Sequence, residues 1–141
     1  MILLDTNVVS EVMRKLPATS VEQWLADQAP ASLFISTVTE AELRFGVALL
    51  PDGKRREALA GRLDEMLEED FAGRILPFDS AAAIDFAVIA SARRRIGRPI
   101  AQFDAQIAAI ARSRGASLAT RNVGDFADCG IAVVDPWRAS T

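Results

Sequence analysis

Short apolar runs that alternate with helical patterns constrain the fold of this chain more than any other feature of its sequence. Five runs have the length of buried strands, at residues 2–4, 33–36, 74–78, 117–120 and 131–134. Between them, apolar residues recur at helical spacing over 21–28, 38–50, 55–71, 81–95 and 103–114. Strands that alternate with helices are typical of an α/β domain with a mostly parallel sheet, and we expect that fold class here.

Chain length and the positions of turn residues favour one domain. The 141 residues are enough for one hydrophobic core and too few for two comfortable ones. Turn residues separate helical patterns at Pro51-Asp52-Gly53 and at Gly97-Arg98-Pro99. The sequence contains no internal repeat, low-complexity tract or linker. We therefore expect a single domain over residues 1–141.

The absence of histidine narrows the chemistry that this chain can perform. It excludes serine–histidine and cysteine–histidine nucleophile pairs, histidine bases and histidine metal ligands. Any catalysis must therefore use carboxylates, hydroxyls, cations or a bound metal.

Composition also bears on the cellular setting. No apolar stretch is long enough to cross a bilayer, and no signal peptide is visible. Cys129 is the single cysteine, which excludes a disulfide framework and favours a reducing compartment. We expect a cytoplasmic protein with no membrane partner. The formal net charge of −3 gives no global support for nucleic acid binding, so a local basic patch would have to supply it.

Asp5 is the first candidate for a functional carboxylate. It closes the apolar run Ile2-Leu3-Leu4 and is followed by Thr6 and Asn7. In open parallel sheets, ligands bind in the crevice outside the carboxyl ends of the strands. Packing does not call for a carboxylate at this point, and we expect Asp5 to lie at such a ligand site.

Glu42 is a second candidate, in the helix expected over 38–50. A turn of 100° per residue places it at the edge of an apolar face. That face comprises Val38, Ala41, Phe45, Ala48 and Leu49. Glu40 lies nearly opposite, four residues before Arg44, where an exposed ion pair is favoured. We expect Glu42 to turn toward the interior, although a helix-edge glutamate with its carboxylate in water explains the pattern equally well.

Asp104 is a third candidate, in the helix expected over 103–114. It aligns with Ile107, Ala108 and Ala111, which would leave room around its carboxylate. An acid in a first helical turn also complements the helix dipole, and for Asp104 taken alone that explanation is the better one. Asp85 holds a similar place on its own helix, and periodicity does not separate the two.

Polar side chains also follow the run at 117–120. Thr120, Asn122 and Asp125 offer a hydroxyl, an amide and a carboxylate. Parallel strands would place these residues beside Asp5, whereas an ordinary polar loop with Asp125 as a helix cap is an equally good interpretation.

A cluster of carboxylates has a chemical consequence. Like charges at close range repel and raise each other's pKa, and a hard divalent cation such as Mg²⁺ relieves that repulsion. Such an ion lowers the pKa of a bound water and stabilises charge on a phosphoryl oxygen. The residues therefore predict a metal-dependent phosphodiesterase.

Basic residues offer a contact for phosphate. We expect it mainly from the cluster that ends the pattern at 81–95, with one further arginine nearby. These residues are Arg93, Arg94, Arg95, Arg98 and Arg121. Phosphate contacts dominate nucleic acid affinity, so an acidic pocket that acts on nucleic acid needs such a surface. For Arg112 and Arg114, favourable placement at a helix C-terminus is the preferred explanation.

Five sequence blocks, in order, carry a resemblance to a known family. They are Leu3-Leu4-Asp5-Thr6-Asn7, Ser36–Gly46, Pro99–Ala109, Ala119–Phe126 and Val134-Asp135-Pro136-Trp137. In these blocks the chain resembles PIN-domain ribonucleases, specifically VapC-type toxins of bacterial toxin–antitoxin pairs and their FitB-like branch. The resemblance implies a three-layer fold, with a five-stranded, mostly parallel sheet flanked by helices.

The resemblance also implies site residues and a cofactor. Asp5, Glu42 and Asp104 align with the catalytic acids that hold Mg²⁺ or Mn²⁺, whose bound water attacks an RNA phosphodiester. Many relatives carry a fourth acid where this chain has Asn122, while others have an aspartate three residues later, here Asp125.

Further polar positions follow from the same resemblance. Thr6, Asn7 and Thr120 look like residues that support the catalytic acids. The family's members dimerise, and a cognate antitoxin covers the groove of each toxin, so we expect an RNA substrate, a homodimer and an antitoxin partner.

Other functions compete with this interpretation. A domain that transfers phosphoryl groups through an aspartyl nucleophile needs a second aspartate where Asn7 stands. The stronger rival is a catalytically idle PIN-like binding or assembly module, or a DNA-binding toxin–antitoxin partner without nuclease activity. Asn122 favours that rival, whereas Glu42 and Asp104 argue against it.

Overall fold

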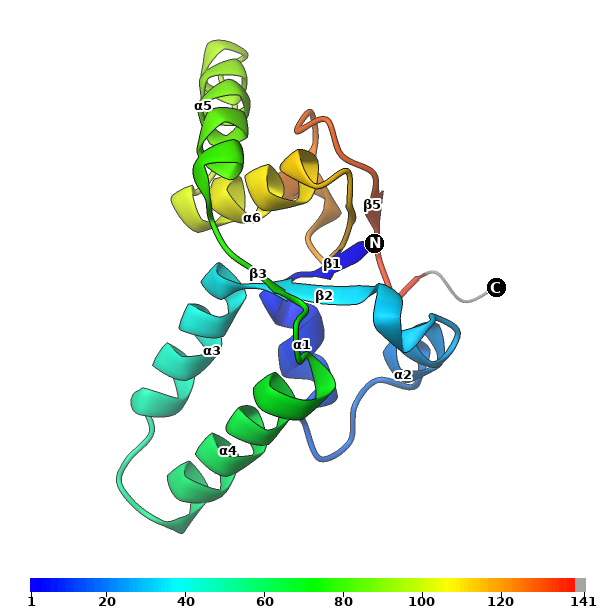
Figure 1. Cartoon of the computed structure of the whole chain (residues 1–141), viewed down its shortest axis with the longest axis vertical. Coiled ribbons are helices and arrows are strands. Elements are labelled where there is room, and N and C mark those ends of the chain that lie inside the picture. Colours follow the sequence, from blue (N-terminus) through cyan, green and yellow to red (C-terminus); the bar gives the residue numbers. More distant parts are fainter. Residues whose placement is uncertain (139–141) are drawn as a thin grey trace.

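The centre of the structure is a parallel sheet (Figure 1). The computed structural model describes residues 1–138, and within them the sheet has five strands in the order β3-β2-β1-β4-β5. The strands are β1 (Ile2–Leu4), β2 (Leu33–Ser36), β3 (Ile75–Leu76), β4 (Ser117–Ala119) and β5 (Val133–Val134). Every neighbouring pair is parallel, which confirms the predicted fold class.

Helices connect successive strands. Within residues 1–138 the α-helices are α1 (Thr6–Val12), α2 (Thr19–Ala26), α3 (Thr37–Ala48), α4 (Lys54–Glu65), α5 (Ser80–Arg95) and α6 (Gln102–Ser113). Three shorter helical segments accompany them: η1 (Pro30–Ser32), η2 (Met66–Asp70) and η3 (Val123–Phe126). In this described part of the chain, no helix is long and apolar enough to cross a membrane.

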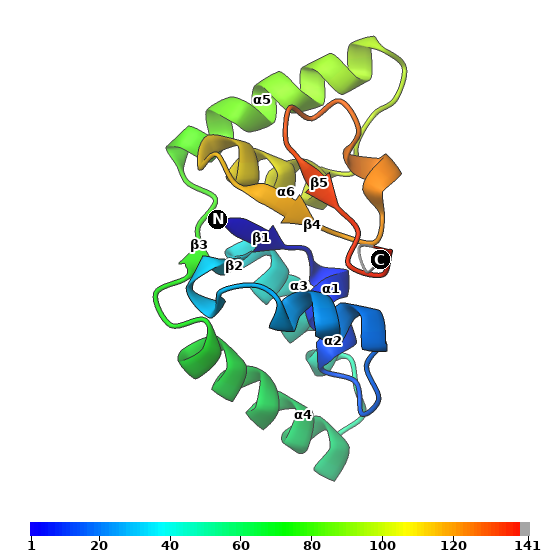
Figure 2. The ribbon, with the colours of Figure 1, turned by 90° about the vertical axis from the view of Figure 1, so that its right-hand side faces the viewer.

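The helices cover both faces of the sheet (Figure 2), with α5 and α6 on one side and α1, α2, α3 and α4 on the other. Successive strand residues point to opposite faces, so each strand contributes to two cores. Leu3 and Leu118 pack in the core that contains the buried residues of α6. Leu4 and Ala119 pack in the core that contains residues of α1, α2 and α4. The sheet therefore needs apolar residues at consecutive strand positions, as the sequence has.

Side-chain caps determine where several helices begin. Asp5 accepts a hydrogen bond from the Thr6 N–H at the start of α1. Ser36 accepts one from the Thr39 N–H at the start of α3, and Asp79 caps α5 in the same way. Two of these caps stand at the carboxyl ends of strands, which places polar side chains at one edge of the sheet.

Some predicted boundaries differ from the structure. The predicted runs 74–78 and 131–134 shorten to β3 and β5, because edge strands pair on one side only. The helix expected over 55–71 ends at Glu65 and continues as the π-helical segment η2. Helix α1 lies outside the ranges that periodicity predicts, since its 7 residues are too few to show a clear period.

Helix α3 buries a different face from the one predicted. Phe45 and Leu49 are 65% and 68% exposed, whereas Thr39 and Leu43 are buried. The prediction that Glu42 borders a buried stripe containing Phe45 and Leu49 is therefore wrong. Glu42 instead lies beside the face formed by Thr39 and Leu43, because α1 packs there and leaves the predicted apolar face uncovered.

Candidate active site

The carboxyl ends of β1, β2 and β4 meet at one edge of the sheet. Asp5 follows β1, Ser36 ends β2 and Thr120 follows β4. The register pairs β1 directly with both neighbours, so these strand ends lie side by side. Polar side chains from three distant parts of the sequence can therefore share one site.

Asp5 is buried, with 5% of its surface exposed, and it is held by several donors. Its Oδ1 accepts the Thr6 N–H at 2.8 Å, and its Oδ2 accepts the Thr120 hydroxyl at 2.7 Å. Asn7 Nδ2 lies 3.4 Å from the same Oδ2. Burial raises the pKa of Asp5, the bonds from Thr120 and Thr6 oppose that shift, and the nearby charges of Glu42 and Asp125 add to it.

Glu42 is partly buried on α3 and reaches toward the start of α1. The Thr6 hydroxyl donates to Glu42 Oε1 at 2.7 Å and lies 3.1 Å from the buried Thr39 hydroxyl. Because Thr6 follows Asp5 directly, this bond orients the Glu42 carboxylate toward the pocket that Asp5 occupies.

Asp104 lies in the first turn of α6 and is partly buried. Burial raises its pKa to about 6, and the negative charges of Asp5, Asp125 and Glu42 contribute to that rise. The four carboxylates therefore act on one another. Ile107, Ala108 and Ala111 are fully buried, as the predicted face of this helix requires.

One open pocket of about 530 Å³ contains the three candidate acids. It lies at the edge of the sheet where Asp5 stands, and polar and cationic groups complete its wall. The lining residues are Asp5, Thr6, Asn7, Ser10, Glu11, Arg14, Glu42, Asp104, Arg121, Asn122 and Trp137. We call it the acid pocket. Asp85 is not among its residues and lies near Arg112, at 4.0 Å, so tertiary structure separates Asp85 from Asp104.

The two candidates for a fourth ligand occupy different places. Asn122 lines the acid pocket, and its N–H donates to Thr120 Oγ1 at 3.1 Å. Asp125 is exposed in η3 and is not among the lining residues, although its charge raises the pKa of both Asp5 and Asp104. Asp125 therefore acts on the acids through its charge and from outside the set of lining residues.

The donor set fits a hard divalent cation. Carboxylate oxygens suit Mg²⁺ and Mn²⁺, and burial together with mutual repulsion raises the pKa of both Asp5 and Asp104, a repulsion that a bound cation would relieve. Among residues 1–138, no three acidic or cysteine side chains converge closely enough to form a complete cage. Mg²⁺ does not need one, because it keeps several waters and is usually bound by one or two carboxylates.

Two arginines line the same pocket. The Arg121 guanidinium lies 5.0 Å from the centre of the Trp137 ring. The backbone N–H of Arg121 donates to Asn7 Oδ1 at 3.3 Å. Arg14 pairs with the buried Glu11 at 3.3 Å, and Glu11 also accepts the Ala18 N–H. Sequence reasoning missed Glu11 and Arg14, although their spacing of three residues across the end of the helix that follows Asp5 was a usable signal.

The predicted basic surface over residues 93–98 divides into exposed and buried parts. Arg94, Arg95 and Arg98 are exposed, whereas Arg93 is 4% exposed. The Arg93 guanidinium donates to backbone carbonyls, so its burial contradicts the predicted phosphate contact. None of these four arginines is among the residues that line the acid pocket.

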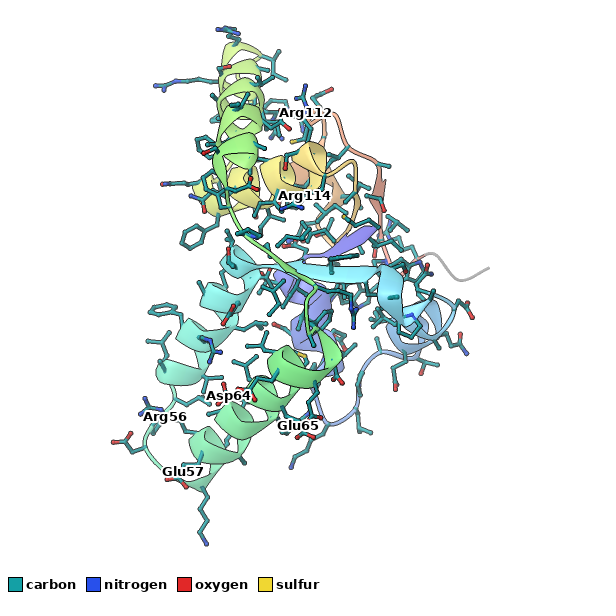
Figure 3. The ribbon with its side chains drawn as sticks, in the orientation of Figure 1. Arg56, Glu57, Asp64, Glu65, Arg112 and Arg114 are labelled. Atoms are coloured by element: carbon teal, nitrogen blue, oxygen red, sulfur yellow. The ribbon has the colours of Figure 1, made fainter. Side chains whose placement is uncertain are left out.

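Arg112 and Arg114 project from the C-terminal end of α6 (Figure 3). Arg114 lies 3.4 Å from Asp79, and Arg112 lies near Asp85. Their position agrees with the expected placement of cations at a helix C-terminus.

A larger groove of about 1190 Å³ adjoins the acid pocket, with residues of α1, α3 and α4 in its wall. Apolar side chains that line it include Leu43, Val47 and Leu63. Five basic residues also line it: Arg14, Lys15, Lys54, Arg55 and Arg62. The groove and the acid pocket share Thr6, Ser10, Arg14 and Glu42, so an occupant of one can reach the other.

Known proteins resemble this chain over nearly its whole length. The family model of the PIN domain matches residues 2–130. The chain is 44% identical to the toxin FitB of Neisseria gonorrhoeae, over 98% of this chain and 99% of that protein. It is 39% identical to the VapC ribonuclease Y4jK of Sinorhizobium fredii, over 98% and 99% of the two chains. A solved structure of FitAB bound to the IR36 DNA fragment contains a chain that matches with a TM-score of 0.94 and 42% identity, covering 100% of this chain and 99% of that one.

Proposed function

The chain belongs to the PIN domain family, and from that premise we propose that it is a VapC-type toxin that cleaves RNA phosphodiesters with a divalent metal ion. The observation that carries this proposal is the acid pocket, in which Asp5, Glu42 and Asp104 line one cavity at the carboxyl edge of the sheet. Similarity to a protein named VapC ribonuclease supports RNA as the substrate. We take residues 1–141 as one PIN domain.

We assign Asp5, Glu42 and Asp104 to binding Mg²⁺ or Mn²⁺, with Asn122 or Asp125 as a further contributor. When bound, such an ion supplies a water of lowered pKa and stabilises charge on a phosphoryl oxygen.

Three polar residues orient the acids. Thr120 donates to Asp5 and Thr6 donates to Glu42, each at 2.7 Å, while Asn7 contacts both Asp5 and Thr120. These bonds orient the carboxylates of Asp5 and Glu42 before any ligand arrives, whereas Asp104 receives no such bond within residues 1–138.

Protonation of the acid pocket competes with metal binding. A metal ligand must be deprotonated, and the pKa of Asp104 is raised to about 6. The carboxylate form of Asp104 therefore predominates only above that pH, and the site becomes more competent for a cation as pH rises through 6.

We assign Arg121 to the RNA phosphate nearest the acids. Trp137 holds its guanidinium at the wall of the acid pocket, which reduces the freedom that binding would otherwise remove. The exposed Arg94, Arg95 and Arg98 lie outside that pocket and would meet only flanking phosphates.

We also propose a cognate antitoxin and a second copy of the chain as partners. Known relatives have been solved as FitAB and VapBC assemblies. The groove beside the acid pocket is lined by both apolar and basic residues, which suits a protein segment that would block RNA. Exposed Phe45, Leu49, Ile84 and Phe103 favour self-association. The cytoplasm remains the proposed compartment, since Cys129 is a free thiol.

An RNA cleavage assay tests this function. Wild type should cleave RNA with Mg²⁺ or Mn²⁺ and stop when a chelator is added. Asp5→Asn should lose about 100-fold or more, because it removes a charge from the metal site. Asp85→Asn is the matched control, since Asp85 shows the same helical periodicity but lies outside the acid pocket.

Each result has a defined meaning. Full activity in Asp5→Asn would refute the assigned site, because the acid at the end of β1 is then dispensable. A wild type that neither cleaves RNA nor gains thermal stability from Mn²⁺ would favour the idle binding module, the alternative that Asn122 supports.

A further inference from the structure

Among residues 1–138, Arg93 is the only basic side chain that is buried. Its Nε donates to the Arg98 carbonyl at 2.7 Å, and its Nη1 donates at 2.9 Å to the carbonyls of both Asp125 and Ala127. A buried charge is costly unless hydrogen bonds satisfy it, and charge-assisted bonds to carbonyls are among the stronger ones. Apart from a contact of Nη1 with Cys129 Sγ at 3.7 Å, this guanidinium bonds to backbone carbonyls, away from the surface where RNA would bind.

The carbonyls that Arg93 binds belong to two separate segments, each of which leads to or follows residues that line the acid pocket. Arg98 lies in the turn between α5 and α6, shortly before Asp104 in the first turn of α6. Asp125 and Ala127 lie in η3 and directly after it. One side chain from α5 thus joins the segment that presents Asp104 to the segment that presents Asp125.

The second of these segments needs outside support. Asp128 has a φ of 61°, which is uncommon for a residue with a side chain and persists where neighbours enforce it. Gly130 also has a positive φ of 75°, and a Cβ there would lie 3.4 Å from Arg112 Nη1. Arg98 Nη1 adds a contact to Asp128 Oδ2 at 3.6 Å. Arginines from α5, from the turn after it and from α6 thus surround residues 125–130.

We infer that Arg93 is a positioning residue of the active site, which ties the turn before α6 to η3 and so sets Asp104 and Asp125 relative to Asp5. This inference rests on the proposed ribonuclease function. Arg93 is buried and bonds to none of the carboxylates of Asp5, Glu42 and Asp104, so it acts through the backbone of the two segments.

The chemistry of the tie favours arginine. The guanidinium carries donors on Nε and on its two terminal nitrogens in a planar fork, so it reaches carbonyls on different sides. A lysine ammonium has three donors at a single point and keeps the charge. Arg93→Lys therefore preserves electrostatics while weakening the tie, and Arg93→Met removes both.

Steady-state cleavage of RNA by Arg93→Lys and Arg93→Met tests the inference, with Arg94→Lys and Arg94→Met as matched controls. Arg94 is the exposed neighbour on the same helix. We expect kcat to fall about 10-fold in Arg93→Lys and about 100-fold in Arg93→Met, because a misplacement near 1 Å costs about that much. The Mn²⁺ concentration at half-maximal rate should rise in both variants, while KM for RNA stays within twofold of wild type.

Three outcomes would overturn the inference. A rise in KM with unchanged kcat would make Arg93 an RNA contact. Equal losses of kcat in the Arg94 variants would mean that any basic residue near the end of this helix has the same effect, and not the hydrogen bonds of Arg93. Failure of both Arg93 variants to fold would show that the residue supports the whole domain rather than two segments.

Hydrogen exchange separates this inference from the function on which it rests. In Arg93→Lys, amides in 97–104 and 122–129 should exchange faster than in wild type, while those of β1 remain protected. This measurement requires no catalysis. If wild type fails to cleave RNA, the proposed function is wrong and the tie is still tested. If wild type cleaves RNA and exchange is unchanged in Arg93→Lys, the tie alone is wrong.

Discussion

The strand side and the helix side of the acid pocket hold their carboxylates in different ways. On the strand side, Asp5 follows β1 and receives bonds from Thr6, Asn7 and Thr120. On the helix side, Asp104 stands in the first turn of α6, and burial with like charge raises its pKa to about 6. Among residues 1–138 no donor offsets that rise.

One pocket thus combines an acid that hydrogen bonds hold in place, Asp5, with an acid whose protonation responds to its surroundings, Asp104. Hydrogen bonds restrict Asp5 whether or not a cation is present. Asp104 depends on the charge balance of the pocket and on the turn that carries it. We therefore expect loss of donors to act on the strand side, and pH and metal to act on the helix side.

Of the three substitutions that test this comparison, removal of the Thr120 hydroxyl should have the largest effect, because it takes away a donor that orients Asp5. Thr120→Val removes the 2.7 Å bond to Asp5 and should lower kcat by about 10–100-fold, the usual cost of losing a residue that orients a metal ligand. Thr37→Val is the control, since Thr37 is exposed and lies outside the pocket. The measurement is steady-state RNA cleavage at saturating Mn²⁺. Wild-type kcat in Thr120→Val would mean that Asp5 needs no orientation from this donor.

On the helix side, Asp104→Asn should make the metal-free protein more stable at neutral pH. The folded state raises the pKa of Asp104 from 3.8 to about 6, so folding binds a proton there. That stabilising contribution is complete below pH 4 and is lost as pH rises through 6. At pH 7.5 Asp104→Asn avoids the charged form, and after solvent screening we expect a gain of about 1 kcal/mol in the free energy of unfolding.

Thermal melting checks this prediction. The gain corresponds to a rise of about 2–4 °C in Tm at pH 7.5, and it should shrink toward zero at pH 4. Asp27→Asn, an exposed acid on the other side of the sheet, controls for loss of charge alone. Added Mn²⁺ should reverse the order, because only wild type keeps the full acid set. A wild type more stable than Asp104→Asn at pH 7.5 without metal would contradict the assigned strain.

Substitution of Trp137 should have the smallest effect on RNA cleavage. It tests a cationic residue of the pocket, Arg121, which the Trp137 ring contacts. The ring holds Arg121 beside the residues that follow β4, and an exposed cation–π contact contributes about 0.5–1 kcal/mol. We expect Trp137→Leu to raise KM for RNA by about two- to fivefold, with kcat unchanged. Trp24→Leu is the control, since Trp24 is outside both pockets. A fall in kcat without a change in KM would mean that Trp137 supports the metal-binding acids and not the binding of RNA.

Local patterns predicted the position of a candidate residue where one element decided it. Asp5 needed only the end of an apolar run, because parallel strands present their carboxyl ends at one edge. The period of α6 correctly predicted the buried face beside Asp104, but it did not separate Asp104 from Asp85. Glu42 was selected for a wrong reason, since the face of α3 that carries Phe45 and Leu49 is exposed.

The sequence by itself determined the α/β class, the parallel strands and the positions at which polar residues leave the sheet. These follow from period, strand length and turn chemistry, which act within a few residues. Tertiary structure decided that Asp104 and not Asp85 reaches the pocket, that Arg93 is buried while Arg94 is exposed, and that Trp137 meets Arg121. Helical periodicity tells on which face of its helix a side chain lies. The residues that it contacts depend on which distant element packs against that face.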